Sequence, residues 1–413
     1  MKKIVIIGSV WPEPNSTAAG QRMMQLIEQF KKLEYEIVFT SISSTSEFAV
    51  NLIELGIQSI SIELNNNSFD DFIKLQNPNL VLFDRFMTEE QFGWRVTQNC
   101  PNSIKILDTE DLHFLREARM QCFKQNVKLE KKDLQNEIAK REIASIYRCD
   151  LTLIISKFEY NLLVNTFSIP PELLHYIPMM YNELDETFLE DYPKFEEREH
   201  FFSIGNFYHK PNWETVLQLK NSIWPLIKKQ LPQAELHIYG AYLPEKAKQL
   251  QNLKEGFIIK GRAKNSASVF KKHKILLAPI PYGAGIKGKL IESMLFGTPN
   301  ITTQIGAEGM QNELNWNGFV ADNPIEFTNK AVSLFTNKDI WKQSQINGIK
   351  IINSTFNKKN FEKDFAEQIQ NLLDNLENHR TQNFMGQILN HHTLKSTMYM
   401  SKWIEEKTKN NYP

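Results

Sequence analysis

Short apolar runs rich in β-branched residues alternate along the chain with longer segments of helical period. This alternation predicts parallel β-sheets whose strands are joined by right-handed crossover helices. In the first half, the predicted strands are residues 4–9, 36–41, 59–62, 79–84, 104–108, 151–156 and 174–178. The helices predicted between them are residues 20–33, 89–98, 112–147 and 157–167.

The alternation stops over residues 179–200, which are acidic and show no strand period, so we expect a linker there. A second series then follows, with predicted strands at residues 201–205, 235–240, 257–260, 275–279, 300–303 and 318–321. The helices predicted in this series are residues 213–229, 266–272, 287–296 and 325–336. From residue 337 onward the sequence has a helical pattern.

The predicted fold class is therefore α/β, with two Rossmann-like, doubly wound domains that face a cleft. A chain of 413 residues is too long for one ordinary hydrophobic core, which supports a division into two domains. We place the first domain at residues 1–180 and the second at 185–375. Residues 376–413 are expected to form helices that can pack back on the first domain.

Composition narrows the class of partner and the compartment. Basic and acidic residues both number 48, so overall charge gives no reason to expect nucleic acid as the main ligand. The three cysteines lack disulfide-framework or zinc spacing, which favours a reducing compartment. The N-terminal apolar run is too short for a signal peptide, and no window approaches the roughly 18 apolar residues of a spanning helix. We expect a cytoplasmic protein whose only membrane contact is peripheral, at the inner face.

The segment PYGAGIKGKLIESMLFGTPN carries the clearest candidate chemistry. Gly283 and Gly285 allow the backbone to approach a ligand closely, and the amides at the start of the next helix favour an anion such as phosphate. Lys287 and Lys289 add positive charge. Glu292 lies one turn deeper on the same face as Lys289, where a carboxylate can accept both hydrogen bonds of a ribose diol. A capped surface helix with a solvated lysine–glutamate pair is the alternative interpretation.

This segment resembles the donor-binding region of family 4 glycosyltransferases of the GT-B fold. The resemblance rests on Lys287, Lys289, Glu292 and the following Gly-Thr-Pro run. Many members of that family carry a second glutamate eight positions before the ribose-binding one, but this chain has Ala284 there. This difference bears on any catalytic or sugar-hydroxyl role of the missing glutamate.

The resemblance extends over nearly the whole chain up to about residue 375. FFSIGNFYHKPNW resembles the phosphate-facing turn that opens the family's second domain. KGRAK resembles a turn that contacts the base, and NSTAAGQRMM resembles a loop and first helix near the donor. For Gly20 and Arg22 the alternative is a tight turn followed by a solvated helix residue. The donor-binding residues implied by the resemblance are Gly20, Gly205, Asn206, Lys210, Arg262, Gly283, Gly285, Ile286, Lys287, Lys289 and Glu292.

His113 is the candidate catalytic residue. It stands in DTEDLHFLREAR, which resembles a family segment after the fifth strand, at the sheet edge where open α/β sheets bind ligands. A histidine can donate to a developing charge or orient a sugar hydroxyl. The alternative is that His113 and the acidic residues before it only cap the helix that follows.

The resemblance implies transfer of a hexose-type sugar from a UDP- or GDP-linked donor to a glycan, lipid-linked or other acceptor, with retention at the anomeric carbon. It implies no cofactor and no metal, and the chain has no Asp-x-Asp metal motif. The segments that follow the first strand of each half, GSVWPEPNSTAAG and GNFYHKPNW, lack G-x-G-x-x-G, which argues against a dinucleotide oxidoreductase. A Walker A motif is also missing, which argues against ATP phosphoryl transfer. A GT-B epimerase or phosphorylase, and a sugar-nucleotide binder without turnover, stay open as alternatives.

Overall fold

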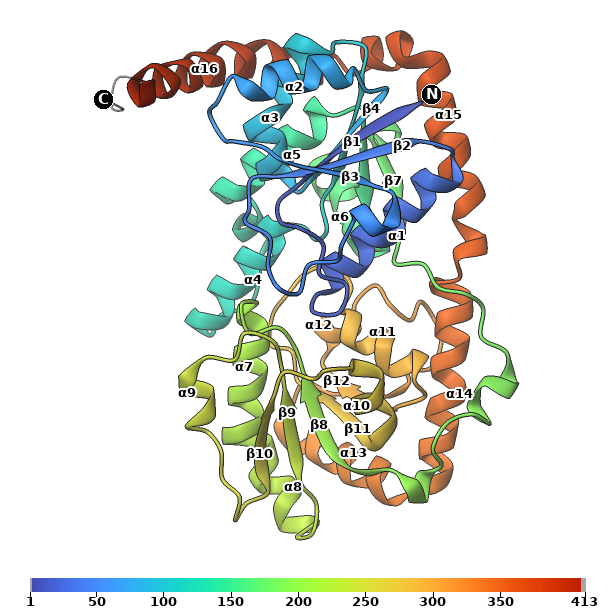
Figure 1. The fold of residues 1–413 in the computed structure, drawn as a ribbon. Coiled ribbons are helices and arrows are strands. Elements are labelled where there is room, and N and C mark those ends of the chain that lie inside the picture. Colours follow the sequence, from blue (N-terminus) through green and yellow to red (C-terminus); the bar gives the residue numbers. More distant parts are fainter. Residues whose placement is uncertain (1, 410–413) are drawn as a thin grey trace.

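The computed structural model describes residues 2–409 and contains two parallel β-sheets, one above the other in Figure 1. The first sheet has the strand order β3-β2-β1-β4-β5-β6-β7. Its strands are β1 (Lys3–Gly8), β2 (Glu36–Ser41), β3 (Gln58–Ser61), β4 (Leu80–Asp84), β5 (Ile104–Asp108), β6 (Leu151–Ile154) and β7 (Leu174–Tyr176).

The second sheet has the order β10-β9-β8-β11-β12-β13. Its strands are β8 (Glu199–Ile204), β9 (Leu236–Tyr239), β10 (Phe257–Gly261), β11 (His273–Ala278), β12 (Asn300–Thr302) and β13 (Gly318–Val320). All the predicted strands are present, with ends within two residues of the predicted ones. Both sheets are doubly wound, and the strand order reverses between β1 and β4 and between β8 and β11.

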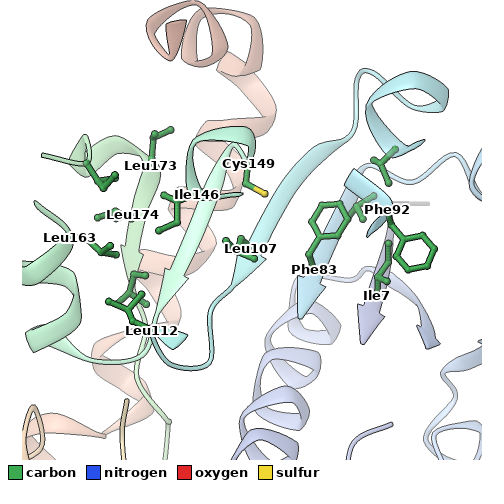
Figure 2. Close-up of a cluster of buried hydrophobic side chains, with 14 of the residues drawn as sticks. Ile7, Phe83, Phe92, Leu107, Leu112, Ile146, Cys149, Leu163, Leu173 and Leu174 are labelled. Atoms are coloured by element: carbon green, nitrogen blue, oxygen red, sulfur yellow. The ribbon is translucent and has the colours of Figure 1, made fainter. Parts of the chain in front are cut away.

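Helices cover both faces of the first sheet (Figure 1). They are α1 (Ala18–Lys32), α2 (Ser68–Gln76), α3 (Phe86–Asn99), α4 (His113–Gln125), α5 (Glu137–Arg148) and α6 (Lys157–Phe167). Side chains of β1 alternate between two cores: Val5 and Ile7 belong to one cluster, while Ile4 and Ile6 belong to the other. Figure 2 shows the first of these clusters, in which Ile7, Phe83 and Leu107 come from adjacent strands.

The single helix predicted over residues 112–147 is wrong. The chain leaves α4 at Asn126, whose φ of 53° is left-handed, and α5 begins after the N-cap Asn136. Asparagine tolerates the left-handed conformation better than most residues, and its short side chain also caps helices, so both asparagines are suited to these positions. The helix α2 was not predicted.

The second sheet is flanked by the helices α7 (Lys210–Gln218), α8 (Trp224–Gln230), α9 (Glu245–Lys248), α10 (Ser266–Lys272), α11 (Gly288–Leu295), α12 (Gln304–Ala307), α13 (Pro324–Thr336) and α14 (Lys338–Thr355). The helix predicted at residues 213–229 is interrupted by a π-helical turn, Leu219–Ile223. Pro225 follows this turn and has no amide hydrogen to close an α-helical bond, which accounts for the irregularity.

Two C-terminal helices, α15 (Glu362–Gln382) and α16 (Phe384–Lys409), return to the first domain (Figure 1). Phe365, Ile369 and Leu372 of α15 are buried in a core cluster of the first sheet. The chain has already crossed back at Phe361, whose ring centroid lies 5.7 Å from that of Tyr176 in β7. α16 packs on α3 and α5.

Short helical turns occupy several connections: Ile53–Leu55, Lys131–Leu134, Pro171–Leu173, Glu186–Leu189, Phe195–Glu197 and Lys358–Asn360. The acidic segment between the domains is packed rather than loose. Tyr192 donates to the Leu295 carbonyl at 2.6 Å, and the buried guanidinium of Arg198 donates to Thr298 at 2.7 Å. Across residues 2–409, the structure contains no helix both long and apolar enough to traverse a bilayer.

Candidate active site

A cavity of about 560 Å³ lies between the two domains, at the carboxyl ends of the strands where each sheet reverses its order. Open α/β sheets bind ligands at this position, because diverging loops leave a crevice there. Residues from both domains line the cavity, including His113 from the first and Glu292 from the second. We call these two sides the first-domain wall and the second-domain wall.

The loop between β11 and α11 forms one continuous part of the second-domain wall. Gly285 has a left-handed φ of 63°, and a Cβ atom there would lie 2.7 Å from the Cβ atom of Asp111 on the opposite wall. Only glycine fits this close approach without strain. Gly283, Ile286, Lys287 and Lys289 also line the cavity, so the structure brings the predicted loop residues together.

Lys287 and Lys289 have only neutral hydrogen-bond partners. Lys287 donates to the Gly285 carbonyl at 2.8 Å, and Lys289 donates to Asn212 Oδ1 at 2.6 Å. Burial lowers the pKa of each ammonium to about 8, although nearby carboxylates act in the opposite direction. Within residues 2–409, no carboxylate oxygen lies within 4.0 Å of either ammonium. The wall therefore presents positive charge that the protein itself does not pair.

Glu292 lies one turn further along α11. Its Oε1 accepts hydrogen bonds from Ser266 at 3.1 Å and from Gln21 of the first domain at 3.4 Å. Burial raises its pKa, while these two donors and Lys289 oppose the rise. Because both donors use Oε1, Oε2 is available to accept from a ligand.

The turn after β8 contributes Gly205 and Asn206 to the cavity lining. Asn206 Oδ1 accepts from the Tyr208 amide at 2.9 Å, and its carbonyl accepts from Asn212 Nδ2 at 2.7 Å. The second bond fixes the amide of Asn212, which in turn holds Lys289. Arg262 also lines the cavity, and its guanidinium carbon lies 3.7 Å from the ring centroid of Phe48 in the first domain.

His113 begins α4 and is buried, with its ring on the first-domain wall. Its Nε2 lies 3.4 Å from Asp111 Oδ1. Burial, assisted by nearby arginines and opposed by Asp111, lowers the pKa of His113 to about 4, so the ring is neutral at pH 7. The side chain of Glu142, not that of His113, accepts the first amides of α4, from His113 at 3.2 Å and Phe114 at 3.0 Å.

The rest of the first-domain wall carries charge of both signs, from Glu110, Asp111, Arg85 and Arg116. Burial, reinforced by Asp108 and Asp84, raises the pKa of Glu110 well above its usual range. Glu110 has a φ of 61°, and Arg85 has φ 71° with ψ 157°, a conformation that side-chain-bearing residues rarely adopt. Such residues cost of order 1–3 kcal/mol and gather at functional sites, which supports this cleft as the site.

Two of the predicted donor residues do not line the cavity. Gly20 packs against the backbone of Glu13, where a Cβ atom would meet backbone atoms at 2.5–2.6 Å. Lys210 opens α7 with an exposed side chain. Arg22, next to Gly20 in space, is neither solvated nor in the cavity lining, because it is buried in an ion pair with Asp108 at 2.8 Å.

Several residues at the site were not singled out from the sequence: Gln21, Arg85, Glu110, Asn212, Ser266 and Glu159. Asn212 carried a weak signal, since it lies in the same motif as Gly205. Glu159 carried none. It comes from α6, and its Oε1 accepts from the amides of Leu112 at 3.1 Å and of Gly285 at 2.7 Å, which joins the two walls.

Further contacts hold the domains around the cleft. Arg119 makes a bidentate pair with Glu308, with both N–O distances 2.7 Å, and also donates to the Gly283 carbonyl at 2.8 Å. Tyr242 donates to the carboxylate of Glu13 at 3.0 Å. These contacts fix the position of the glycine-bearing loop against the first domain.

Residues 198–337, which contain the whole second-domain wall, match the family model of the glycosyl transferases group 1. Over these residues the second domain is similar to the group 1 glycosyltransferases. No curated protein sequence matches the chain. The matched segment contains the turn at Gly205 and Asn206, both cavity lysines and Glu292.

Solved structures that match about nine-tenths of the chain show that it has the GT-B fold. Sucrose-phosphate synthase from Thermosynechococcus elongatus is 14% identical, with a TM-score of 0.65, over 91% of this chain and 100% of that one. HepE from Anabaena, solved in complex with UDP and glucose, is 12% identical, with a TM-score of 0.66, over 90% of this chain and 100% of that one. A variant of TarM from S. aureus, solved with fondaparinux, alpha-GlcNAc-glycerol and UDP, is 10% identical, with a TM-score of 0.67. The match covers 89% of this chain and 100% of that one.

Proposed function

We propose that the protein transfers a sugar from a UDP- or GDP-linked donor to a hydroxyl of a glycan or lipid-linked acceptor, with retention of anomeric configuration and without a metal. The observation that carries the proposal is the pair of cavity ammoniums, Lys287 and Lys289, which lack carboxylate partners. A buried cation is costly without a counter-ion, and a nucleotide diphosphate supplies two negative charges at this place.

The neighbouring groups suit the rest of a donor. Glu292 has an unpaired oxygen one turn from Lys289 and can accept from a ribose hydroxyl. The structures of HepE and TarM contain UDP, which makes uracil the first base to test here.

The reaction breaks the bond between the anomeric carbon and the diphosphate oxygen and forms a bond from that carbon to the acceptor oxygen. Negative charge grows on the leaving diphosphate, so Lys287 and Lys289 stabilise the transition state more than the bound donor. The acceptor loses its hydroxyl proton, which the departing diphosphate can take up. Neutral His113 on the opposite wall orients a hydroxyl of the reacting sugar.

A binding protein without turnover is the second candidate, favoured by Ala284, which stands where many family 4 members have a glutamate. The two candidates agree on donor binding and differ in catalysis. A cytoplasmic location with peripheral access to a membrane fits a lipid-linked acceptor and is part of the proposal.

A thermal-shift screen against UDP, GDP, ADP and their sugars tests donor binding first, because a ligand that binds only the native state raises Tm. Donor hydrolysis and transfer are then measured with the best donor, with and without EDTA. We expect turnover that survives EDTA and falls in His113→Ala with little change in donor Kd. Binding without hydrolysis or transfer for any donor and a broad acceptor panel would favour the binder, and activity restored only by Mn²⁺ or Mg²⁺ would overturn the metal-free proposal.

A further inference from the structure

Three side chains with metal-binding atoms converge at the end of the second sheet that faces away from the cleft. His200 lies near the start of β8, Glu235 directly precedes β9, and His237 lies within β9. Their ligand atoms all lie within 4.8 Å of one another. Glu235 Oε2 is 2.8 Å from His237 Nε2 and 3.7 Å from His200 Nε2.

Hydrogen bonds behind His237 determine which of its nitrogens carries the hydrogen. His273 Nδ1 lies 2.7 Å from the Val269 carbonyl, which can only accept, so this nitrogen is protonated. His273 is 1% exposed and has no carboxylate partner, so its ring is neutral and its Nε2 has no hydrogen. His237 Nδ1, 2.8 Å from that Nε2, must therefore be the donor.

A neutral His237 then directs an Nε2 without hydrogen at the carboxylate of Glu235. Two lone pairs at 2.8 Å repel each other unless a positive species lies beside them. A proton on Nε2 would satisfy this one contact. A metal ion would satisfy it and also use the nearby Nε2 of His200.

We propose that His200, Glu235 and His237 bind one divalent transition-metal ion, zinc by their donor set, at the amino ends of β8 and β9. Zinc takes imidazole and carboxylate ligands at about 2.0–2.2 Å in a tetrahedron, which puts ligand atoms about 3.4 Å apart. The two distances from Glu235 bracket this value. The side chains of His200 and Glu235 are 27% and 37% exposed, which leaves a fourth position open to solvent.

The hydrogen bonds behind His237 are those expected of a metal-binding histidine. A ligating histidine almost always donates its other ring N–H to an acceptor, which fixes its orientation and tautomer. His273 is that acceptor for His237 and is itself anchored on Val269. His200 is the adjustable ligand: its Nδ1 accepts from the Glu235 amide at 3.3 Å, and ligation through Nε2 would give up that weak bond.

The site cannot take part in the reaction at the cleft. From His200 to Ile204, the last residue of β8, the strand extends about 13 Å at roughly 3.3 Å per residue, and the cavity lining begins at Ile204. A metal here would join two adjacent strands and stabilise the second domain. The inference is therefore independent of the proposed transfer reaction.

The test is a calorimetric titration of the full-length, chelator-treated protein with Zn²⁺, together with a thermal melt. We expect one Zn²⁺ per chain and a raised Tm, and Co²⁺ should give the intense visible bands of a tetrahedral site. Glu235→Gln and His237→Ala should each weaken binding by at least about 10-fold, since even losing an outer-shell partner typically costs 10–100-fold. The matched control is H391N/H392N, which removes the adjacent histidines near the C-terminus and should bind Zn²⁺ normally.

His200→Ala provides a second ligand variant at a half-buried position, in case His237→Ala does not fold. Loss of binding in H391N/H392N with retention in the ligand variants would place the ion at the C-terminal histidines and overturn the proposal. No binding to the wild type would also overturn it, and would leave a shared proton as what holds Glu235 and His237 together.

Discussion

The two walls of the cleft differ in how they treat charge. The first-domain wall pairs part of its charge internally: Asp111 is bound by Arg116, and directly behind the cavity lining Asp108 is bound by Arg22. The second-domain wall leaves Lys287 and Lys289 with only neutral partners. A wall whose charges are already paired can position neutral hydroxyls, whereas unpaired cations require an anionic ligand. For the proposed transfer reaction, the comparison favours the second-domain wall for the diphosphate and the first-domain wall for the sugar and acceptor.

The largest expected effect comes from removing a cation of the second-domain wall. Lys287→Ala should lower kcat by about 10²–10³-fold, the usual effect of losing one group aimed at developing charge, and should change donor Kd less. Steady-state kinetics alongside calorimetric Kd values measure both. Lys272→Ala, on the exposed end of α10, is the control and should behave as wild type. A rise in Kd with unchanged kcat would mean that the lysine only binds the ground state.

Glu292 gives a smaller effect, confined to binding. Glu292→Ala should weaken UDP binding by about 1.5–3 kcal/mol, or about 10- to 150-fold, because a charged hydrogen-bond partner is lost. Glu292→Gln keeps one acceptor oxygen and should lose less. Titration with 2′,3′-dideoxy-UDP is the matched control, since a ligand without the ribose diol should bind wild type and variant equally. Equal losses for both ligands would remove the ribose from the assignment.

The pH dependence of binding separates the two walls in the unmodified protein. Both cavity lysines have a pKa of about 8, lowered from the ordinary value of lysine by burial. An anion binds best when they are protonated, so donor affinity should be highest below pH 8 and fall above it, by about 10-fold per lysine between pH 7 and 9. Lys289→Ala should reduce this slope. A flat profile from pH 7 to 9 would show that the lysines keep their protons throughout.

The sequence predicted much of the second-domain wall, because its residues lie close together in the chain. Glycine spacing, two lysines and a glutamate within ten positions define the loop and helix that the structure shows. Alternation of apolar runs likewise predicted every strand, since a buried parallel strand shows its character locally. Helix interruptions were harder, as at residues 126–136, where two asparagines rather than a proline or glycine end and restart the helix.

The first-domain wall was predicted less well because its residues meet only through the fold. Arg22 and Asp108 are 86 positions apart, and Glu159 is 126 positions from Gly285. Nothing in the sequence around Glu159 distinguishes it from a solvated helix residue. The roles of Gly20 and Lys210 rested on the resemblance. In the structure Gly20 packs against backbone and the Lys210 side chain is in solvent, and tertiary packing decides both environments.

Glu159 gives the smallest expected effect and tests whether the walls are coupled. Burial, reinforced by Asp111, raises the pKa of Glu159 from the ordinary range of a glutamate to about 7. The folded protein therefore binds more protons than the unfolded chain between about pH 4.5 and 7, so this group lowers stability as pH rises through that window. Glu159→Gln keeps an acceptor for both amides and carries no charge at any pH. Urea unfolding at pH 5 and pH 8 should show the variant losing less stability than wild type between the two values.

Glu142→Gln is the matched comparison for Glu159→Gln. The pKa of Glu142 is raised to about 8, again chiefly by burial, but its carboxylate accepts only from first-domain amides. Both variants should flatten the pH dependence of stability. Only Glu159→Gln touches the Gly285 amide, so only that variant should change UDP affinity, and by less than the lysine and Glu292 variants do. Equal effects of the two variants on UDP affinity would show that Glu159 acts as a packing residue of the first domain. The position of one wall would then not depend on the Glu159 contact with the other.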